Sequence, residues 1–340
     1  MGDTENTPFL HGGDLTAARQ RFAGAPEPLI DLSTGINPFS YPLPLLPRTL
    51  FTRLPDAAAT TRLAAVAAQA YCAPDAANVV PAPGTQILLP LVATLVPPGD
   101  AVVLGPTYAE HARPLALAGH RVRETPDIAD FAKAALAVVV NPNNPDGRLI
   151  PRERLLSLAA AKRRKGGLLV VDEAFMDVGP LGYSVAGDVE RGSTVVLRSF
   201  GKFFGLAGLR LGFAIAARDV ATRLAAALGP WAVAGPALAI GTAALADTAW
   251  CSAMRRTLEE QARQLDQTLS GAGLATFGGT SLFRFVETSE AYSLFDRLGE
   301  AGILVRRFWD HPTWLRFGLS PDAAARGSLR AALSGQSHQR

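Results

Sequence analysis

Short apolar runs rich in valine recur between residues 79 and 217 of the 340-residue chain. Each run is about four residues long and is continuous rather than alternating. Such runs are typical of strands that are buried on both faces of a mostly parallel sheet. The predicted strands are 79–80, 101–104, 137–140, 168–171 and 194–197.

Helical patterns separate these runs at Thr85–Val96 and Pro151–Lys165. Proline in the first turn suits a helix start, and basic residues in the last turn suit a helix end. Strands that alternate with helices in this way predict an α/β fold with a mostly parallel sheet. In such sheets ligands bind at the carboxyl ends of the strands.

The pattern changes after residue 235. A long helical stretch with charges at helical spacing runs from about 236 to 269, and short strands follow near 280–286 and 304–306. We therefore expect a small α+β domain that also includes the N-terminal arm. The three expected parts are the N-terminal arm 1–40, the large α/β domain 41–235 and the small domain 236–340.

Composition narrows the function classes. Hydrophobic residues make up 48% of the chain and charged residues 19%, which excludes a disordered protein. The formal charge is only +3, a weak signal for nucleic-acid binding, so we expect no nucleic-acid partner. Cys72 and Cys251 are too few and too far apart for a disulfide framework or a metal site. This cysteine usage fits a reducing compartment, and with no export signal in the first residues we expect a cytoplasmic protein.

The segment Leu224–Ala246 carries no charge and is long enough to cross a bilayer. Two Gly-Pro pairs interrupt it, at residues 229–230 and 235–236. Proline removes a backbone hydrogen bond of a helix and clashes with the preceding turn. We therefore expect a helix end, a bend and a new helix here, and no membrane span.

Lysine is scarce, since only four of the 33 basic side chains are lysines. Lys202 follows a predicted buried strand, within the glycine- and aromatic-rich segment Ser199–Arg210. Burial disfavours the ammonium form of lysine, lowers its pKa and favours nucleophilic chemistry. Lys202 is therefore the candidate catalytic lysine, and we expect the other three, Lys133, Lys162 and Lys165, to be solvated.

Three further features lie at predicted strand ends. Asp172 ends a buried strand, where a carboxylate needs a cationic partner. That partner is either a bound group, such as a protonated ring nitrogen, or one of Arg198 and Arg210, and a helix N-cap is a third interpretation. Asn141–Gly147 is a turn-rich loop after another strand. Gly84–Gln86 opens a helix directly after a strand, an arrangement that suits a bound phosphate.

These features keep a characteristic order along the chain. Asn144 and Asp172 are 28 residues apart, Asp172 and Lys202 are 30 apart, and Lys202 and Arg210 are 8 apart. On this motif set the chain, from about residue 10 to 335, resembles the fold-type I, pyridoxal-phosphate-dependent aminotransferase class I/II superfamily. The resemblance implies pyridoxal phosphate as the cofactor, no metal, and a homodimer with its sites at a two-fold interface.

The resemblance also implies roles for these residues. As catalytic residues, Lys202 would bind the cofactor aldehyde covalently, Asp172 would keep the ring nitrogen protonated, and Tyr108 would stack on the ring face. Asn144 would hydrogen-bond the ring hydroxyl. The residues expected to hold the cofactor phosphate are Gly84, Thr85, Gln86, Ser199 and Arg210.

Three local segments resemble the threonine-phosphate decarboxylases of cobalamin biosynthesis, a group similar to histidinol-phosphate aminotransferases. They are His11–Asp14, Asp31–Pro38 and Asp172–Phe175. In the resembling enzymes the N-terminal arm folds over the substrate. His11 and Asn37 are therefore candidates for contacts with the substrate.

Two arginines of the small domain complete the substrate site that the resemblance implies. Arg316 matches the arginine that binds the substrate α-carboxylate, a task that suits a bidentate guanidinium. Arg306 matches the arginine that helps to bind the substrate phosphate. Arg307 is the alternative to Arg306, because neighbours in a strand point to opposite faces.

The implied reaction is the decarboxylation of O-phospho-L-threonine to (R)-1-aminopropan-2-yl phosphate. The alternative is an aminotransferase of a phosphorylated amino compound such as histidinol phosphate. Phe175 and Leu54 stand where histidinol-phosphate aminotransferases carry tyrosines, which weakens the aminotransferase alternative more than the decarboxylase. A cofactor-binding regulatory protein is a third interpretation, disfavoured because the fold leaves no room for a DNA-binding module.

Overall fold

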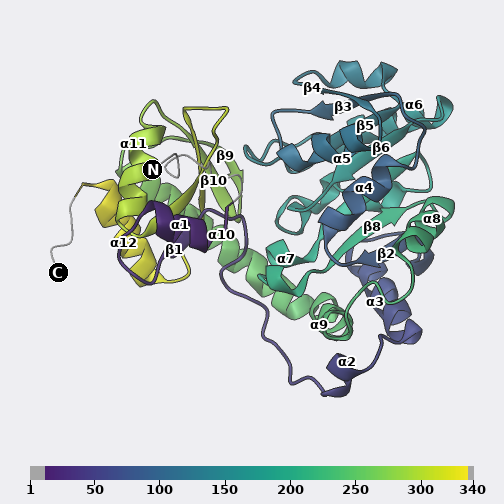
Figure 1. The fold of residues 1–340 in the computed structure, drawn as a ribbon, viewed down its shortest axis with the longest axis horizontal. Helices are drawn as coiled ribbons and strands as arrows, with labels where there is room; N and C mark the ends of the chain where they lie inside the picture. Colours follow the sequence, from purple (N-terminus) through teal and green to yellow (C-terminus); the bar gives the residue numbers. More distant parts are fainter. Residues whose placement is uncertain (1–11, 336–340) are drawn as a thin grey trace, which may run out of the picture. The chain divides into compact units, whose positions relative to one another are not determined.

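The structure, a computed structural model, describes residues 12–335. The chain forms two compact units. The large unit is Ser40–Ala253, and the small unit combines the described residues before Ser40 with those from Met254 onward. Each unit contains a sheet with helices packed on it, so the predicted α/β class is confirmed (Figure 1).

Seven strands form the sheet of the large unit, in the order β2-β8-β7-β6-β5-β3-β4. The strands from β7 to β4 pair in parallel, whereas β8 is antiparallel to both β2 and β7. The five strands predicted from the apolar runs are confirmed as β2, β3, β5, β6 and β7. The bounds are β2 Val79–Ala82, β3 Asp100–Leu104, β4 Arg121–Thr125, β5 Leu136–Val140, β6 Leu168–Asp172, β7 Thr194–Ser199 and β8 Gly212–Ala216.

Helices cover the sheet of the large unit, and one core lies between the sheet, α4 and α8. Leu88 and Val92 of α4 and Leu224 of α8 pack with Val138 and Val170 of the central strands in this core. The helix bounds are α2 Thr49–Thr52, α3 Ala57–Ala70, α4 Leu88–Ala93, α5 Ala112–Leu117, α6 Arg152–Arg164, α7 Phe200–Phe203, α8 Arg218–Leu228 and α9 Gly235–Ala246.

Both helices predicted within the α/β region are present. The one expected at 85–96 begins as a 3-10 turn, η2 (Thr85–Ile87), and continues as α4. The one expected at 151–165 is α6, with Pro151 as its N-cap residue and three basic residues in its last turn. Both helices follow strands of the sheet, so each carries the chain from one parallel strand towards the next.

The small unit contains a five-stranded sheet in the order β1-β11-β12-β10-β9. The N-terminal segment supplies its edge strand β1, which pairs in parallel with β11, while the other neighbours are antiparallel. The strand bounds are β1 Ile30–Leu32, β9 Thr276–Thr280, β10 Phe283–Glu287, β11 Ile303–Arg307 and β12 Trp314–Gly318. The helix bounds are α1 Leu15–Arg21, α11 Ala291–Glu300 and α12 Ala323–Leu333, together with α10 Thr248–Gly271, which begins in the large unit.

The division between the units falls later in the chain than the expected boundary at 235/236. It lies between Ala253 and Met254, inside α10, so that α9 belongs to the large unit. The reason is packing: α9 lies against α3, and its Gly235 touches the backbone of Leu50 so closely that a Cβ would clash. A change in hydrophobic pattern therefore marked a new helix rather than a new domain.

The region from 224 to 271 contains two breaks. α8 ends at Leu228, Gly229 has a φ of 73°, and α9 starts at Gly235, which confirms the predicted helix end, bend and new helix. The long helical stretch expected at 236–269 is in fact α9 and α10, which meet at an angle of 77°. Within residues 12–335 no single helix is long and apolar enough to cross a membrane, although this bent pair passes together on length and composition.

Candidate active site

A cavity of about 170 Å³ lies at the carboxyl ends of the parallel strands of the large unit. Val140 ends β5, Asp172 ends β6 and Ser199 ends β7, and all three line it. The predicted cofactor-binding residues come from six separate places in the sequence, yet every one of them lines this cavity. They are Gly84, Thr85, Gln86, Tyr108, Asn144, Asp172, Ser199, Lys202 and Arg210.

Lys202 is presented to the cavity by the short helix α7, which starts directly after β7. Phe200 and Phe203 on the same helix are buried, and Phe200 stacks on Phe204 with the ring centroids 4.3 Å apart. These aromatic rings fix the helix, so that the half-buried Lys202 can reach the cavity. Its ammonium lies 5.7 Å from the ring centroid of Phe175, another residue of the cavity lining.

Asp172 has a histidine as its partner. His111 Nε2 lies 2.9 Å from Asp172 Oδ2, both side chains are buried, and the backbone N–H of Ala174 donates to Asp172 Oδ1. The arginine proposed as an alternative, Arg198, instead pairs with Glu173 and Asp177. Asp172 is therefore held from both oxygens by groups other than the two predicted arginines.

His111 is a site residue that the sequence analysis missed. It ends the 3-10 turn η3 (Ala109–His111), whose N-cap residue is Tyr108. The two rings pack edge to face, with centroids 5.8 Å apart. The available signal was its position one turn after Tyr108, because residues three apart share a face of a 3-10 helix.

Gly84 and Arg210 form one end of the cavity. Gly84 has a φ of 85°, which favours glycine, and a Cβ built on it would lie 2.8 Å from Arg210 Nη2, so a side chain here would displace that guanidinium. Gly212 likewise lets β8 approach the loop, since a Cβ there would lie 2.7 Å from the backbone nitrogen of Thr85. The guanidinium of Arg210 is thereby placed against the loop that carries Thr85, which suits the binding of a phosphate.

A hydrogen-bonded link joins the loops that follow β3 and β5. Thr107 Oγ1 donates to Asn143 Oδ1 at 2.6 Å, and Asn143 Nδ2 donates to the carbonyl of Pro106 at 3.0 Å. Tyr108 follows Thr107 and Asn144 follows Asn143, and both Tyr108 and Asn144 line the cavity. The buried Asn143 therefore ties together the two loops that carry the predicted ring contacts.

In the small unit, Arg306 and Arg316 lie directly opposite each other on the antiparallel strands β11 and β12. Like charges in such a cross-strand pair repel, and burial makes the repulsion stronger. Burial lowers the pKa of Arg316 to about 9, and the charge of Arg306 acts in the same direction. A bound anion between these two side chains would relieve the repulsion.

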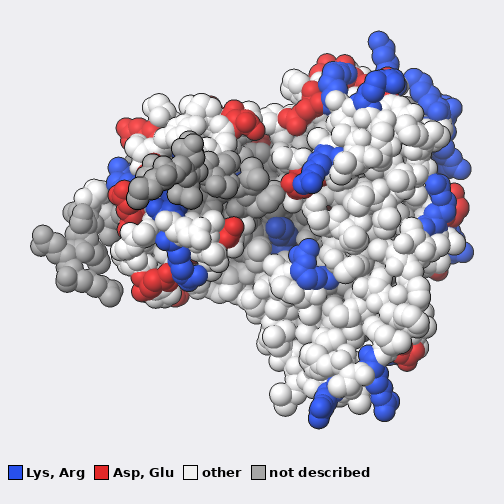
Figure 2. Space-filling view, in the orientation of Figure 1, with Lys and Arg blue, Asp and Glu red and all other residues white. Residues whose placement is uncertain are grey.

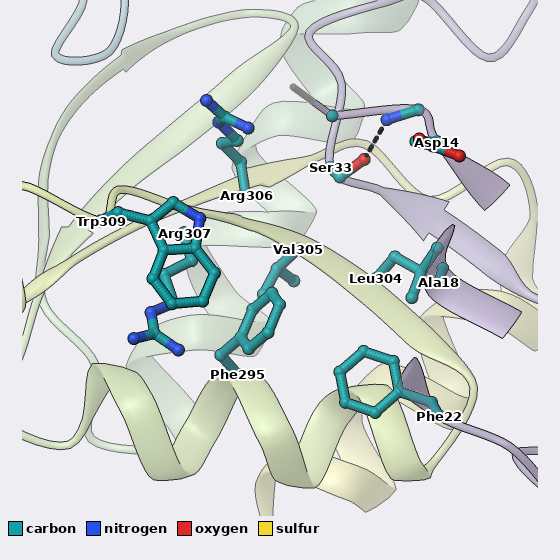
Figure 3. A pocket seen from close by; sticks show the side chains of 12 residues that line it. Asp14, Ala18, Phe22, Ser33, Phe295, Leu304, Val305, Arg306, Arg307 and Trp309 are labelled. Carbon is teal, nitrogen blue, oxygen red and sulfur yellow. Dashed lines mark hydrogen bonds between the residues drawn. The ribbon is translucent and has the colours of Figure 1, made fainter. Parts of the chain in front are cut away.

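Arg307 belongs to the other face of β11, and the two neighbours point in opposite directions (Figure 3). The guanidinium of Arg307 is stacked between two rings, 3.3 Å from the centroid of Tyr292 and 3.8 Å from that of Trp309. Of the two candidates for phosphate binding, Arg306 is thus the one that shares a face with Arg316.

Asn37 and His11 are the two candidates from the N-terminal arm. Asn37 is buried, and its Oδ1 accepts a hydrogen bond from the backbone N–H of Phe39 at 2.8 Å. His11 lies outside the described residues. The backbone N–H of Gly13 donates to Ser33 Oγ at 2.9 Å, which holds the arm beside the loop that follows β1 (Figure 3).

The prediction for Lys162 was wrong. Lys133 and Lys165 are exposed as expected, but Lys162 is buried, and its ammonium donates to the carbonyls of Phe131, at 2.5 Å, and Ala134. Both acceptors are at the end of the 3-10 helix η4 (Ile128–Lys133), and the carbonyl of Phe131 also accepts from the backbone N–H of Ala134. Lys162 therefore has a structural role away from the cavity.

Comparison with known proteins decides the family. The model of the family "Aminotransferase class I and II" matches residues 48–331. The chain belongs to this family.

Two curated relatives within the family are threonine-phosphate decarboxylases. The protein of Sinorhizobium sp is 47% identical, covering 97% of this chain and 98% of the relative, and that of Pseudomonas aeruginosa is 40% identical, covering 96% and 97%. A solved structure of a histidinol-phosphate aminotransferase from Sinorhizobium meliloti, in complex with pyridoxal-5'-phosphate, matches with a TM-score of 0.81. At 21% identity over 97% of this chain and 95% of that one, the match shows the fold alone.

Aminotransferases of class I and II depend on pyridoxal phosphate, and the residues of the cavity fit this cofactor. The close approach of Arg210 to Gly84 leaves a cationic, side-chain-free cradle for a phosphate. Asp172 would offer a buried carboxylate to a protonated ring nitrogen, and Lys202 would offer the amine. The protein is a pyridoxal-phosphate-dependent enzyme of this family.

Proposed function

We propose that the enzyme decarboxylates O-phospho-L-threonine to (R)-1-aminopropan-2-yl phosphate, a step of cobalamin biosynthesis. The observation that carries the proposal is the pair of opposed arginines, Arg306 and Arg316, in a chain that also has the cofactor cavity. Two cations facing each other suit a small substrate with two anionic groups, a phosphate and a carboxylate. The names of the two relatives support the same substrate.

Each residue of the cavity has a defined task in this proposal. Lys202 would hold the cofactor through its side-chain amine. Asp172, held by His111, keeps a proton on the ring nitrogen. Asn144 contacts the ring hydroxyl and Tyr108 the ring face. The cofactor phosphate is held by Gly84, Thr85, Gln86, Ser199 and Arg210.

The bound cofactor supplies an electron sink for the pair of electrons released at the substrate Cα. In decarboxylation the bond between Cα and the carboxylate carbon breaks, carbon dioxide leaves, and a proton is added at Cα. In this proposal Arg316 would hold the substrate carboxylate and Arg306 would hold the substrate phosphate. His11 and Asn37 are proposed to contribute further substrate contacts.

The product distinguishes this reaction from transamination. The purified enzyme with pyridoxal phosphate and O-phospho-L-threonine should release one carbon dioxide for each substrate consumed, without a keto acid. Carbon dioxide is followed by a coupled assay. Transamination of O-phospho-L-threonine or of histidinol phosphate, with 2-oxoglutarate as the amino acceptor, is followed by the glutamate formed. Stoichiometric glutamate without gas release would establish the aminotransferase alternative instead.

A homodimer is part of the proposal. Large apolar side chains are exposed around α2, and Leu45 is fully solvent-accessible in the single chain. Figure 2 shows a mostly uncharged surface in this region, with a few basic side chains at its edge. Exposed apolar clusters mark interaction surfaces, which supports a second copy of the chain as the partner. Sedimentation equilibrium should therefore give twice the mass of one chain. The residues of the cluster are Leu43, Leu45, Phe51 and Leu54.

The proposed location is the cytoplasm, and the proposed partners are the substrate and a second copy of the chain. No disulfide joins Cys72, which is exposed, and Cys251, which is buried, and this supports a reducing compartment. The near-neutral formal charge of +3 supports a protein without a nucleic-acid partner.

A further inference from the structure

A second group of charged side chains is buried in the large unit. Arg198, Glu173 and Asp177 are 2%, 0% and 4% exposed. Arg198 Nη1 lies 2.9 Å from Glu173 Oε2, and Arg198 Nη2 lies 2.6 Å from Asp177 Oδ1. Glu173 also accepts hydrogen bonds from Ser184 Oγ and the backbone N–H of Val185. These three charged residues, named here the β6–β7 cluster, are not part of the cavity lining.

The cluster lies back to back with the cofactor cavity. Glu173 follows Asp172, and Arg198 precedes Ser199. Successive side chains of a strand point to opposite faces of the sheet. Asp172 and Ser199 line the cavity, so the cluster residues hold the opposite face of the same two strand ends.

The cluster also lies where backbone pairing between the two strands stops. The last paired residues are Asp172 and Leu197, and the backbone N–H of Glu173 donates to the carbonyl of Leu197 at 2.8 Å. Beyond this point the segment after β6 turns towards η5 (Met176–Val178), and the segment after β7 enters α7. Past the last paired residues, the side chain of Arg198 on the β7 segment pairs with both Glu173 and Asp177 on the segment that follows β6.

The charges of the cluster favour a fixed geometry. Burial by itself lowers the pKa of Arg198, but Asp177 and Glu173 raise it above its usual value, so the guanidinium stays charged. Burial raises the pKa of Glu173, and Arg198 opposes this shift. Buried ion pairs stabilise a fold no better than apolar residues of equal volume, whereas the planar guanidinium fork is directional. Orientation is therefore the property that distinguishes this cluster from an apolar core.

We propose that Arg198, Glu173 and Asp177 are positioning residues that fix the ends of β6 and β7, and thereby set Asp172 and Ser199 against the cofactor. This inference rests on the cofactor-binding roles proposed above. It predicts that disturbing the fork changes how the cofactor is held, beyond any change in stability.

The test uses Arg198→Lys, which keeps the buried charge but cannot reach both carboxylates in one plane. The dissociation constant for pyridoxal phosphate should rise about tenfold, the size seen when outer partners of a site are altered. The pH midpoint of the visible absorbance of the bound cofactor should shift as well. Lys162→Met is the matched control, since it removes another buried cation of the large unit and should leave both values unchanged.

Glu173→Gln is measured in parallel, in case Arg198→Lys fails to fold. It keeps the shape of the side chain and one hydrogen-bond acceptor. It should weaken cofactor binding and shift the same pH midpoint. If a folded variant binds the cofactor as the wild type does, with the same midpoint, the positioning role is refuted while the proposed function stands. If the wild-type protein itself shows no visible band with pyridoxal phosphate, the proposed function fails first.

Discussion

The two units arrange their buried and half-buried charges in opposite ways. At the strand ends of the large unit, Asp172 is matched by His111, and Arg198 is matched by two carboxylates. In the small unit, Arg306 and Arg316 are set against each other across β11 and β12. The first arrangement holds its groups in place before any ligand arrives. In the second, the charge of Arg306 acts against that of Arg316 while Asp31 acts in the opposite direction, and in the proposed function an anionic substrate would relieve part of this repulsion.

The strongest test of this contrast is Arg316→Met. Removing one of the two opposed cations should lower kcat/KM for O-phospho-L-threonine by roughly 100-fold, the scale for truncating a buried, hydrogen-bonded charge partner. Steady-state decarboxylation assays measure the change.

Arg284→Met is the matched control for that variant. Arg284 lies on the neighbouring strand β10 of the same sheet, but it already pairs with Asp266 at 2.6 Å. Its loss should leave kcat/KM within about twofold of the wild type. Equal losses in both variants would mean that Arg316 only supports the sheet.

His111→Phe tests the large unit with a smaller expected effect. The change keeps a ring of similar size but removes the contact with Asp172 Oδ2, so kcat should fall about tenfold. His120→Phe is the control, because His120 is also buried and its ring nitrogens hydrogen-bond to backbone groups of Ala93 and Gly99. The idea is wrong if the two variants have the same kcat.

Lys162→Met should affect stability without affecting chemistry. It removes the contacts to the carbonyls of Phe131 and Ala134, which should cost about 1–2 kcal/mol of unfolding free energy. Chemical denaturation measures this loss, and decarboxylase activity per folded enzyme should not change. A drop in activity at unchanged stability would contradict the structural role.

The same residue predicts a pH dependence. Burial, with Lys165 acting in the same direction, lowers the pKa of Lys162 from 10.5 to about 8. Between these two values the unfolded chain binds more protons than the folded chain, so unfolding free energy should rise with pH across the window. Denaturation of wild type and Lys162→Met at several pH values should show a shallower rise in the variant.

The parallel strands could be predicted because a strand buried on both faces needs a continuous apolar run, as in Leu168–Asp172. β4 could not, since it is an edge strand with the sequence RVRET and mostly exposed side chains. β8 reads GFAIA, in which small residues weaken the strand signal, and its antiparallel direction depends on tertiary packing.

The site was predictable to the extent that chemistry restricts residue type. Lys202 stood out because lysine is scarce and this one follows a buried strand. His111 did not, because its partner Asp172 is 61 positions away and a single histidine has no periodic signal. Lys162 was misjudged because the sequence KRRK is typical of a solvated helix end, whereas its acceptors come from a turn about 30 residues earlier.

Gly84 has a consequence for sequence variation in this enzyme. A side chain there would meet the far end of Arg210, which can move aside, so the fold would survive while the phosphate cradle would not. Gly24 has a similar φ of 90°, but a Cβ there meets nothing within 4 Å. A library of substitutions sorted by solubility would treat the two glycines alike. Sorted by retention of bound cofactor, it should separate them, because Gly84 lines the proposed cofactor cavity and Gly24 does not.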